Sequence, residues 1–279
     1  MANLDLRPLS LGEILDRTFS LYRRNFLLFV GITALPQLLV LALNLTQTLW
    51  VMAPTRRAVS PTLGAVALVG MLVGLLVYLV AYLFAQGGTV YAVSDLYLGR
   101  STSIGASLRR MRGQAASLLG VIMLNGLATF VGLILLIIPG IYLACRLITC
   151  VPSALLENLG PRASLERSYE LTKDSAGRSF VIYLLYFVLL YGAVLLLSAP
   201  FVFGIAMSAK DPAMLRVWMS LNQVGSFLAT ILVTPIFTIA TAVFYYDLRV
   251  RKEAFDLQMM MNPGAPGALQ STGVPKTFS

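Results

Sequence analysis

The chain has 279 residues, of which 58% are hydrophobic and 12% are charged, and its formal net charge is +9. A soluble domain carries about 25% charged residues, so this composition predicts an integral membrane protein. The chain contains no histidine, which excludes histidine metal ligands, histidine acid–base chemistry and Ser-His-Asp triads. The positive charge fits loops that face an anionic leaflet, and we expect no nucleic-acid partner.

The first predicted element is an amphipathic helix over residues 10–24, within the stretch "LSLGEILDRTFSLYRRNF". Ser10 and Glu13 form a capping-box pattern, which predicts that a helix begins there. Apolar residues then recur every three or four positions on one face, and the charged residues lie mainly on the other. We expect this helix to lie in the plane of the membrane interface and to lead into the first span.

Six apolar segments predict six membrane spans. They cover about residues 26–49, 63–90, 118–138, 141–156, 180–206 and 224–246. Only "IIPGIY" separates the third from the fourth, and the Pro139-Gly140 pair predicts a turn there. We expect a tight helical hairpin, although a kinked or re-entrant pair over residues 118–156 would fit the same pattern.

The interfacial helix recurs twice, over about residues 103–115 and 161–174. Pro161 suits the first turn of the last of these, and Leu165, Tyr169 and Thr172 would share its apolar face. A Leu-x-Arg pattern is common to all three helices, with its arginine at Arg17, Arg110 and Arg167. The sequence therefore predicts an all-α polytopic protein of three transmembrane hairpins, each preceded by an interfacial helix.

The last span ends in "YYDLRVRKEAFDL", which indicates a solvated helix end with an Arg249–Glu253 pair four residues apart. We take residues 1–257 as one membrane domain and residues 258–279, rich in Pro, Gly, Ser and Thr, as a disordered tail. The predicted cytoplasmic interface consists of Arg17, Arg110, Arg167, Asp247 and Arg249.

Orientation follows from the distribution of lysine and arginine. Sixteen of them flank the spans on the side of both termini, and four lie on the other side. This asymmetry predicts that both termini are cytoplasmic.

Three polar residues fall inside the predicted spans and are candidates for a ligand site: Arg146, Asn125 and Gln86. An intramembrane arginine is costly and therefore a functional candidate, but it can also bind backbone carbonyls that a proline frees. Asn125 and Gln86 are typical of hydrogen bonds between helices. No phosphate-binding loop, dinucleotide fingerprint, zinc spacing or nucleophile elbow occurs, and we expect no cofactor, no metal and no enzymatic activity.

Four stretches together resemble the glycerophosphoryl diester phosphodiesterase membrane-domain family. They are "LSLGEILDRTFSLYRRNF", "VSDLYLGRSTSIGASLRR", "IPGIYLACRLITCVPSALLENLGPRASLERSYELTK" and "YYDLRVRKEAFDL". The resemblance covers about residues 9–257 and implies a multi-pass protein of a prokaryotic plasma membrane. It extends only to the membrane module, because the catalytic phosphodiesterase domain needs histidines and α/β sequence that this chain does not have.

The sequence favours a non-enzymatic membrane scaffold or partner-binding module. Its expected partners are the bilayer, anionic lipids at the cytoplasmic face and a membrane or cytoplasmic protein, and Gly70-x-x-x-Gly74 is a weak sign of a homo-oligomer. The alternative is a transporter or lipid-handling protein with an anionic-ligand site near Arg146.

Overall fold

The computed structural model describes residues 7–51, 61–208 and 210–253. Within these ranges the chain forms ten α-helices and no strand. The helices are α1 (Leu11–Arg24), α2 (Phe26–Val51), α3 (Pro61–Tyr97), α4 (Ile104–Met111), α5 (Ala115–Leu135), α6 (Ile137–Arg146), α7 (Cys150–Leu156), α8 (Pro161–Leu171), α9 (Ala176–Met207) and α10 (Pro212–Glu253). The predicted tail, residues 258–279, lies outside the described residues.

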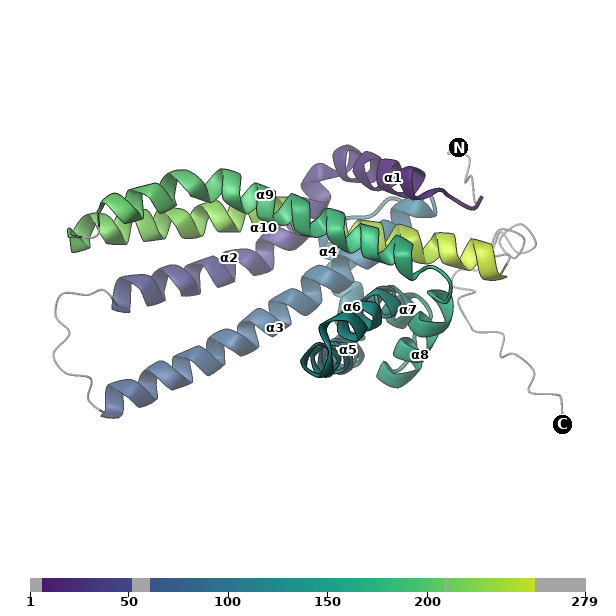
Figure 1. The fold of residues 1–279 in the computed structure, drawn as a ribbon, viewed down its shortest axis with the longest axis horizontal. Coiled ribbons are helices and arrows are strands. Elements are labelled where there is room, and N and C mark those ends of the chain that lie inside the picture. The colour runs from purple at the N-terminus through teal and green to yellow at the C-terminus, as the bar shows by residue number, and fades with distance from the viewer. Residues whose placement is uncertain (1–6, 52–60, 209, 254–279) are drawn as a thin grey trace.

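Four long helices, α2, α3, α9 and α10, run lengthwise beside one another (Figure 1). With α5 and the α6–α7 segment, they make six helices long and apolar enough to cross a membrane. Their outward side chains are large and apolar, as at Leu76 and Leu196, which are 63% and 76% exposed. Such a surface requires a lipid environment, so the chain is a multi-pass membrane protein.

Helix α10 forms the centre of the fold and contacts α1, α2, α3, α7, α8 and α9. Its 42 residues would extend about 63 Å at the usual rise of an α-helix, roughly twice the thickness of a bilayer's hydrocarbon core. Its C-terminal half carries the core of the protein, where Phe244, Tyr245 and Tyr246 are at most 1% exposed. Of the segment that we expected to be a solvated helix end, residues 245–250 are buried, and exposure begins only at Arg251.

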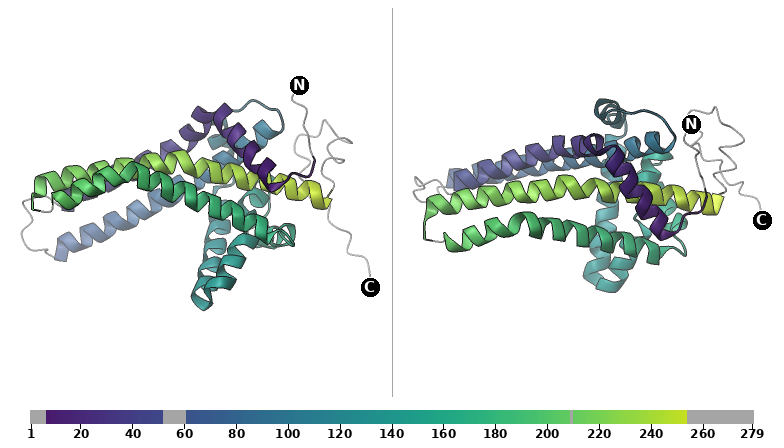
Figure 2. Two further views of the ribbon diagram at one scale, coloured as in Figure 1. Left: turned by 45° about the horizontal axis from the view of Figure 1, so that its top comes forward. Right: turned by 90° about the horizontal axis from the view of Figure 1, so that it is seen from above.

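The short helices α1, α4, α7 and α8 gather around one end of the long helices, near the C-terminal end of α10 (Figures 1 and 2). We call these four helices, together with the C-terminal ends of α3 and α10 and the start of α9, the cap. Most of the buried apolar core lies here, whereas the opposite half of α3 exposes nearly every side chain from Leu68 to Val80.

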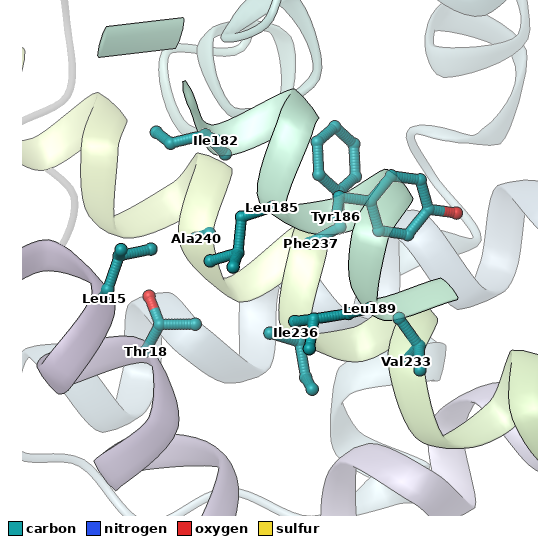
Figure 3. A pocket seen from close by; sticks show the side chains of 10 residues that line it. All are labelled: Leu15, Thr18, Ile182, Leu185, Tyr186, Leu189, Val233, Ile236, Phe237 and Ala240. Atoms are coloured by element: carbon teal, nitrogen blue, oxygen red, sulfur yellow. The ribbon is translucent and has the colours of Figure 1, made fainter. Parts of the chain in front are cut away.

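The capping box predicted at the start of α1 is confirmed. The Ser10 hydroxyl accepts a hydrogen bond from the Glu13 N–H at 3.3 Å, and a Glu13 carboxylate oxygen accepts one from the Ser10 N–H at 2.6 Å. The buried face of α1 carries Ile14, Thr18 and Tyr22. Figure 3 shows this helix against α9 and α10, where the remaining crevice of about 10 Å³ has room for about one water.

Helix α4 is shorter than the predicted 103–115 and packs on glycines of α2 and α3. A Cβ atom on Gly31 would lie 2.5 Å from the Ile104 side chain, and one on Gly87 would lie 2.1 Å from the Met111 sulfur. The apolar face of α4 is therefore covered by two neighbouring helices.

Helix α8 begins at Pro161 in its first turn, as predicted, and its buried face agrees with the prediction in part. Thr172 is buried and Leu165 packs against the core, whereas Tyr169 is 46% exposed. The small side chain of Ser168 is also buried on α8, which approaches α5 and α7 closely.

Helices α5 and α6 form a hairpin that runs transverse to the four long helices, as both views show (Figures 1 and 2). The turn of this hairpin lies at Leu136, where the backbone is extended, and Pro139-Gly140 falls within the first turn of α6. Placing the turn at Pro139-Gly140 was therefore wrong, because a proline is tolerated in the first helical turn. The glycine serves packing, since a Cβ atom on Gly140 would lie 2.5 Å from the backbone nitrogen of Leu133.

The predicted fourth span, 141–156, is two helices separated at residues 147–149. The carbonyl oxygen of Arg146 accepts hydrogen bonds from the hydroxyls of Ser168 at 3.0 Å and Thr172 at 2.7 Å. Pro152 lies in the first turn of α7 and cannot donate a helical hydrogen bond. In a continuous helix the Arg146 carbonyl would accept a bond from a backbone N–H. Here the hydroxyls of Ser168 on α8 and of Thr172 at the end of α8 take that place, and so stabilise the break.

Candidate functional site

Arg146, the only ionisable residue well inside a predicted span, lies at the end of α6 and is 5% exposed. Its Nη2 donates a hydrogen bond of 2.6 Å to the carbonyl oxygen of Tyr169, and its guanidinium carbon lies 3.8 Å from the centroid of the Tyr169 ring. Nη1 of Arg146 lies 3.5 Å from the hydroxyl of Tyr142, one turn earlier on α6. Together with the two hydroxyls on the Arg146 carbonyl, these contacts attach α8 to the break between α6 and α7.

One nitrogen of Arg146, Nε, is buried and has no hydrogen-bond partner among the described residues. The side chain lines an open cleft of about 670 Å³, whose charged lining residues also include Glu170, Lys173 and Asp174. Two positive and two negative side chains thus share this cleft, which weakens its attraction for an anion.

Gln86 and Asn125 do not join Arg146 in one site. Gln86 is 9% exposed on α3, and its side-chain oxygen accepts a hydrogen bond of 2.9 Å from the hydroxyl of Thr238 on α10. Asn125 lies on α5, and its side-chain oxygen has no partner among the described residues. Neither residue lines the cleft at Arg146.

Asp247, predicted to lie at an interface, is buried inside the cap with its side chain 0% exposed. Its carboxylate accepts hydrogen bonds from the backbone N–H of Leu9 at 2.6 Å, from Arg178 at 2.8 Å and from Arg251 at 3.0 Å. Both arginines also donate to the carbonyl oxygen of Leu9. The residue that precedes the first helix is therefore held by the last helix and by the start of α9.

A second buried cluster centres on Glu157, which follows α7. Its carboxylate binds Arg167 on α8 at 2.9 Å and the hydroxyl of Tyr245 on α10 at 2.8 Å. Glu253 binds Arg249 at 2.8 Å, as their four-residue spacing predicted. It also binds Arg167. Burial lowers the pKa of Arg167, but the charges of Glu157 and Glu253 outweigh it and raise that pKa above its usual value.

The other two repeated arginines reach α3. Arg17 donates a hydrogen bond of 2.8 Å to the hydroxyl of Tyr97, whose ring stacks on Tyr246 at 4.8 Å. Arg110 lies over the ring of Tyr91 at 4.5 Å and pairs with Asp95 at 3.4 Å. The arginines of the three short helices therefore join these helices to the ends of neighbouring spans.

Three acids at the ends of apolar helices occupy equivalent places: Asp95 on α3, Glu157 after α7 and Asp247 on α10. We call them the exit acids. Asp95 and Glu157 bind the short helix that follows each of them, α4 and α8, whereas Asp247 binds Leu9, which precedes α1. The sequence interpretation missed this relationship, although "SDL", "LEN" and "YDL" recur at the end of every second apolar segment.

In the part of the chain that the structure describes, no group of three or more Cys, Asp or Glu side chains could hold a metal ion. The buried clusters are ion pairs whose oxygens already accept hydrogen bonds from arginine, tyrosine and backbone groups. Their arrangement holds helices together, as where Glu157 joins α8 to α10.

No family model, curated protein or solved structure matches this chain.

Proposed function

We propose that the protein is a non-enzymatic scaffold or partner-binding module of a prokaryotic plasma membrane, with the cap and both termini in the cytoplasm. The observation that carries the proposal is the construction of the cap. Buried ion pairs of Asp247 and Glu157 join α1, α8, α9 and α10 into one body. The resemblance to a membrane-domain family without its catalytic domain agrees with this proposal.

The outer surface of the cap is basic. Arg23 and Arg24 at the end of α1 are exposed, as are Arg109 and Arg112 in and after α4 and Arg162 on α8. Such a surface attracts anionic lipid headgroups and acidic partner surfaces, and it agrees with the excess of positive charge expected on the cytoplasmic side. A fixed platform of this kind loses little conformational entropy when a partner binds to it.

The alternative function, transport or lipid handling through an anionic ligand at Arg146, is favoured by the unpartnered Nε and the adjacent cleft. The two carboxylates of the cleft and the hydrogen bond to the Tyr169 carbonyl favour a structural role. We therefore place this function second.

Two measurements test the proposal. First, a cysteine introduced at Arg109 must react with an impermeant reagent from the cytoplasmic side, and one at Lys210 from the opposite side. Labelling of both from one side would contradict the proposed orientation.

Second, a photo-crosslinking residue at Arg112 in living cells should give an adduct of one defined mass, and the same residue at Lys210 should not. The identified partner, once purified, should bind the reconstituted protein and lose affinity for the Arg109→Glu/Arg112→Glu double variant, with Lys210→Glu as the control. If no partner binds, and if reconstituted vesicles move an anionic lipid in a way that Arg146→Gln abolishes, the alternative function replaces this proposal.

A further inference from the structure

A second polar region lies between α2 and α10, in the half of the molecule away from the cap. Gln37, Asn44 and Thr48 recur on α2 at spacings of seven and four residues, which places them on one face of the helix. The facing positions of α10 carry Asn222, Gln223, Ser226 and Thr230. Polar side chains on both helices thus face each other inside segments that are otherwise apolar.

These residues, except Thr48, line a cleft of about 210 Å³. Val40, Leu41 and Phe227 complete its lining, and none of its lining residues is charged. This space has room for several waters, so it can hold a small organic molecule. The lining offers no counter-charge, which disfavours an ion.

Several polar groups of the cleft already have partners within the protein. The amide nitrogen of Gln223 donates to the hydroxyl of Thr48, and the Thr230 hydroxyl donates to the Ser226 carbonyl oxygen at 2.9 Å. The Ser226 hydroxyl lies 3.3 Å from that of Ser198 on α9. These bonds hold the wall of the cleft in one arrangement.

Two acceptors remain unsatisfied. The side-chain oxygens of Asn222 and Gln223 are buried and have no hydrogen-bond partner among the described residues. An unpaired amide oxygen in an apolar environment is unfavourable, so an occupant that donates hydrogen bonds would be stabilised there. Both residues line the cleft, but neighbouring atoms cover the two oxygens, so a rotation of each amide would bring its oxygen to an occupant.

We propose that the cleft between α2 and α10 binds a small uncharged polyol group. A hydroxyl group both donates and accepts, so it can satisfy the two amide oxygens and use the remaining amide and hydroxyl groups of the cleft. The carbon skeleton of a polyol would contact Val40, Leu41 and Phe227. The group could come from a free polyol or from the uncharged glycerol headgroup of a lipid, since both present the same hydroxyls.

The test measures saturable binding of two radiolabelled probes, glycerol and 1-monooleoylglycerol, to the purified full-length protein in lipid nanodiscs. The variant Asn222→Leu should weaken binding about tenfold or more, because it removes one unsatisfied acceptor. Gln37→Leu, on the opposite wall, should also weaken it. Asn125→Leu is the matched control, since that asparagine has an unpartnered oxygen on α5 and does not line the cleft.

Binding of glycerol by itself would identify a free polyol as the ligand, and binding restricted to monooleoylglycerol would identify a lipid headgroup. Either result supports the site if the two wall variants lose affinity and remain monodisperse on gel filtration. The proposal is overturned if neither probe binds saturably, or if the folded wall variants bind as tightly as Asn125→Leu. This proposal does not depend on the partner-binding role of the cap.

Discussion

The carboxylate of Asp247 accepts a hydrogen bond of 2.6 Å from the backbone N–H of Leu9, although 238 positions separate the two residues. Arg178 and Arg251 bind the same carboxylate and the carbonyl oxygen of Leu9. One buried side chain therefore connects the start of α1, the start of α9 and the end of α10.

Replacement of the Asp247 carboxylate should strongly destabilise the folded protein. Asp247→Asn leaves two arginines without their buried anion, and we expect the free energy of unfolding to fall by about 3 kcal/mol. Unfolding by SDS titration in detergent micelles measures this change. Asp95→Asn is the control, because its pair with the half-exposed Arg110 is longer, at 3.4 Å, and should contribute less than about 1 kcal/mol. Equal losses in the two variants would contradict the central role of Asp247.

Two arginines on α8 provide a second matched comparison. The side chain of Arg167 is 23% exposed and binds two carboxylates, whereas that of Arg162 is 89% exposed and pairs with Glu166. We expect Arg167→Gln to destabilise the protein by about 2–4 kcal/mol and Arg162→Gln by less than about 0.5 kcal/mol, measured by the same SDS titration. A larger loss for Arg162→Gln would show that the buried cluster does not hold α8.

The close approach of α5 and α6 predicts an effect of a single methyl group. In Gly140→Ala the new Cβ atom would lie 2.5 Å from the backbone nitrogen of Leu133, and backbone cannot move aside as a flexible side chain can. We expect a loss of about 1–3 kcal/mol in the free energy of unfolding.

Gly126→Ala is the control for this glycine. It lies on the same hairpin with nothing within 4 Å of the new atom, so it should be neutral or stabilising by up to about 1 kcal/mol. If Gly140→Ala behaves like Gly126→Ala, the hairpin is not as closely packed as the structure describes.

The start of α1 should respond to acid. Hydrogen bonds from the Ser10 backbone N–H and hydroxyl and from Arg7 lower the pKa of Glu13 from 4.5 to about 2. A lowered pKa means that the ionised side chain stabilises the folded helix start at pH values above 4.5, and that this stabilisation is lost as the pH falls toward 2.

Amide hydrogen exchange at residues 11–14, compared between wild type and Glu13→Gln at each pH, measures this effect. Protection in the wild type should exceed that in the variant at pH 7, and the difference should disappear near pH 2. A difference that persists unchanged at pH 2 would contradict the assigned cause.

Local signals in the sequence were sufficient for some of these features. Ser10 and Glu13 are three residues apart, and their capping box could be predicted because it involves only one turn of helix. The arginine–glutamate pair at the end of α10 was predictable for the same reason. The six apolar segments are recognisable because each is long and carries few charges.

Features that depend on distant residues could not be predicted in this way. The break after Arg146 is stabilised by Ser168 and Thr172, which lie more than 20 positions later. Asp247 and Arg249 resemble a solvated helix end until Leu9, Arg178 and Glu157 are placed around them. The polar cleft was missed because Gln37 and Asn44 are isolated in their own segment and meet their counterparts only when α2 packs on α10.

The hydrogen bond between Leu9 and Asp247 also has a consequence for biosynthesis. The ribosome makes Leu9 early and Asp247 238 residues later. The bond that holds the start of α1 can therefore form only after almost all of the described chain has been synthesised. A chain that ends before α10 would leave α1 without the helix on which it packs and to which Tyr22 is bonded. The same contact that closes the finished fold thus distinguishes complete chains from unfinished ones.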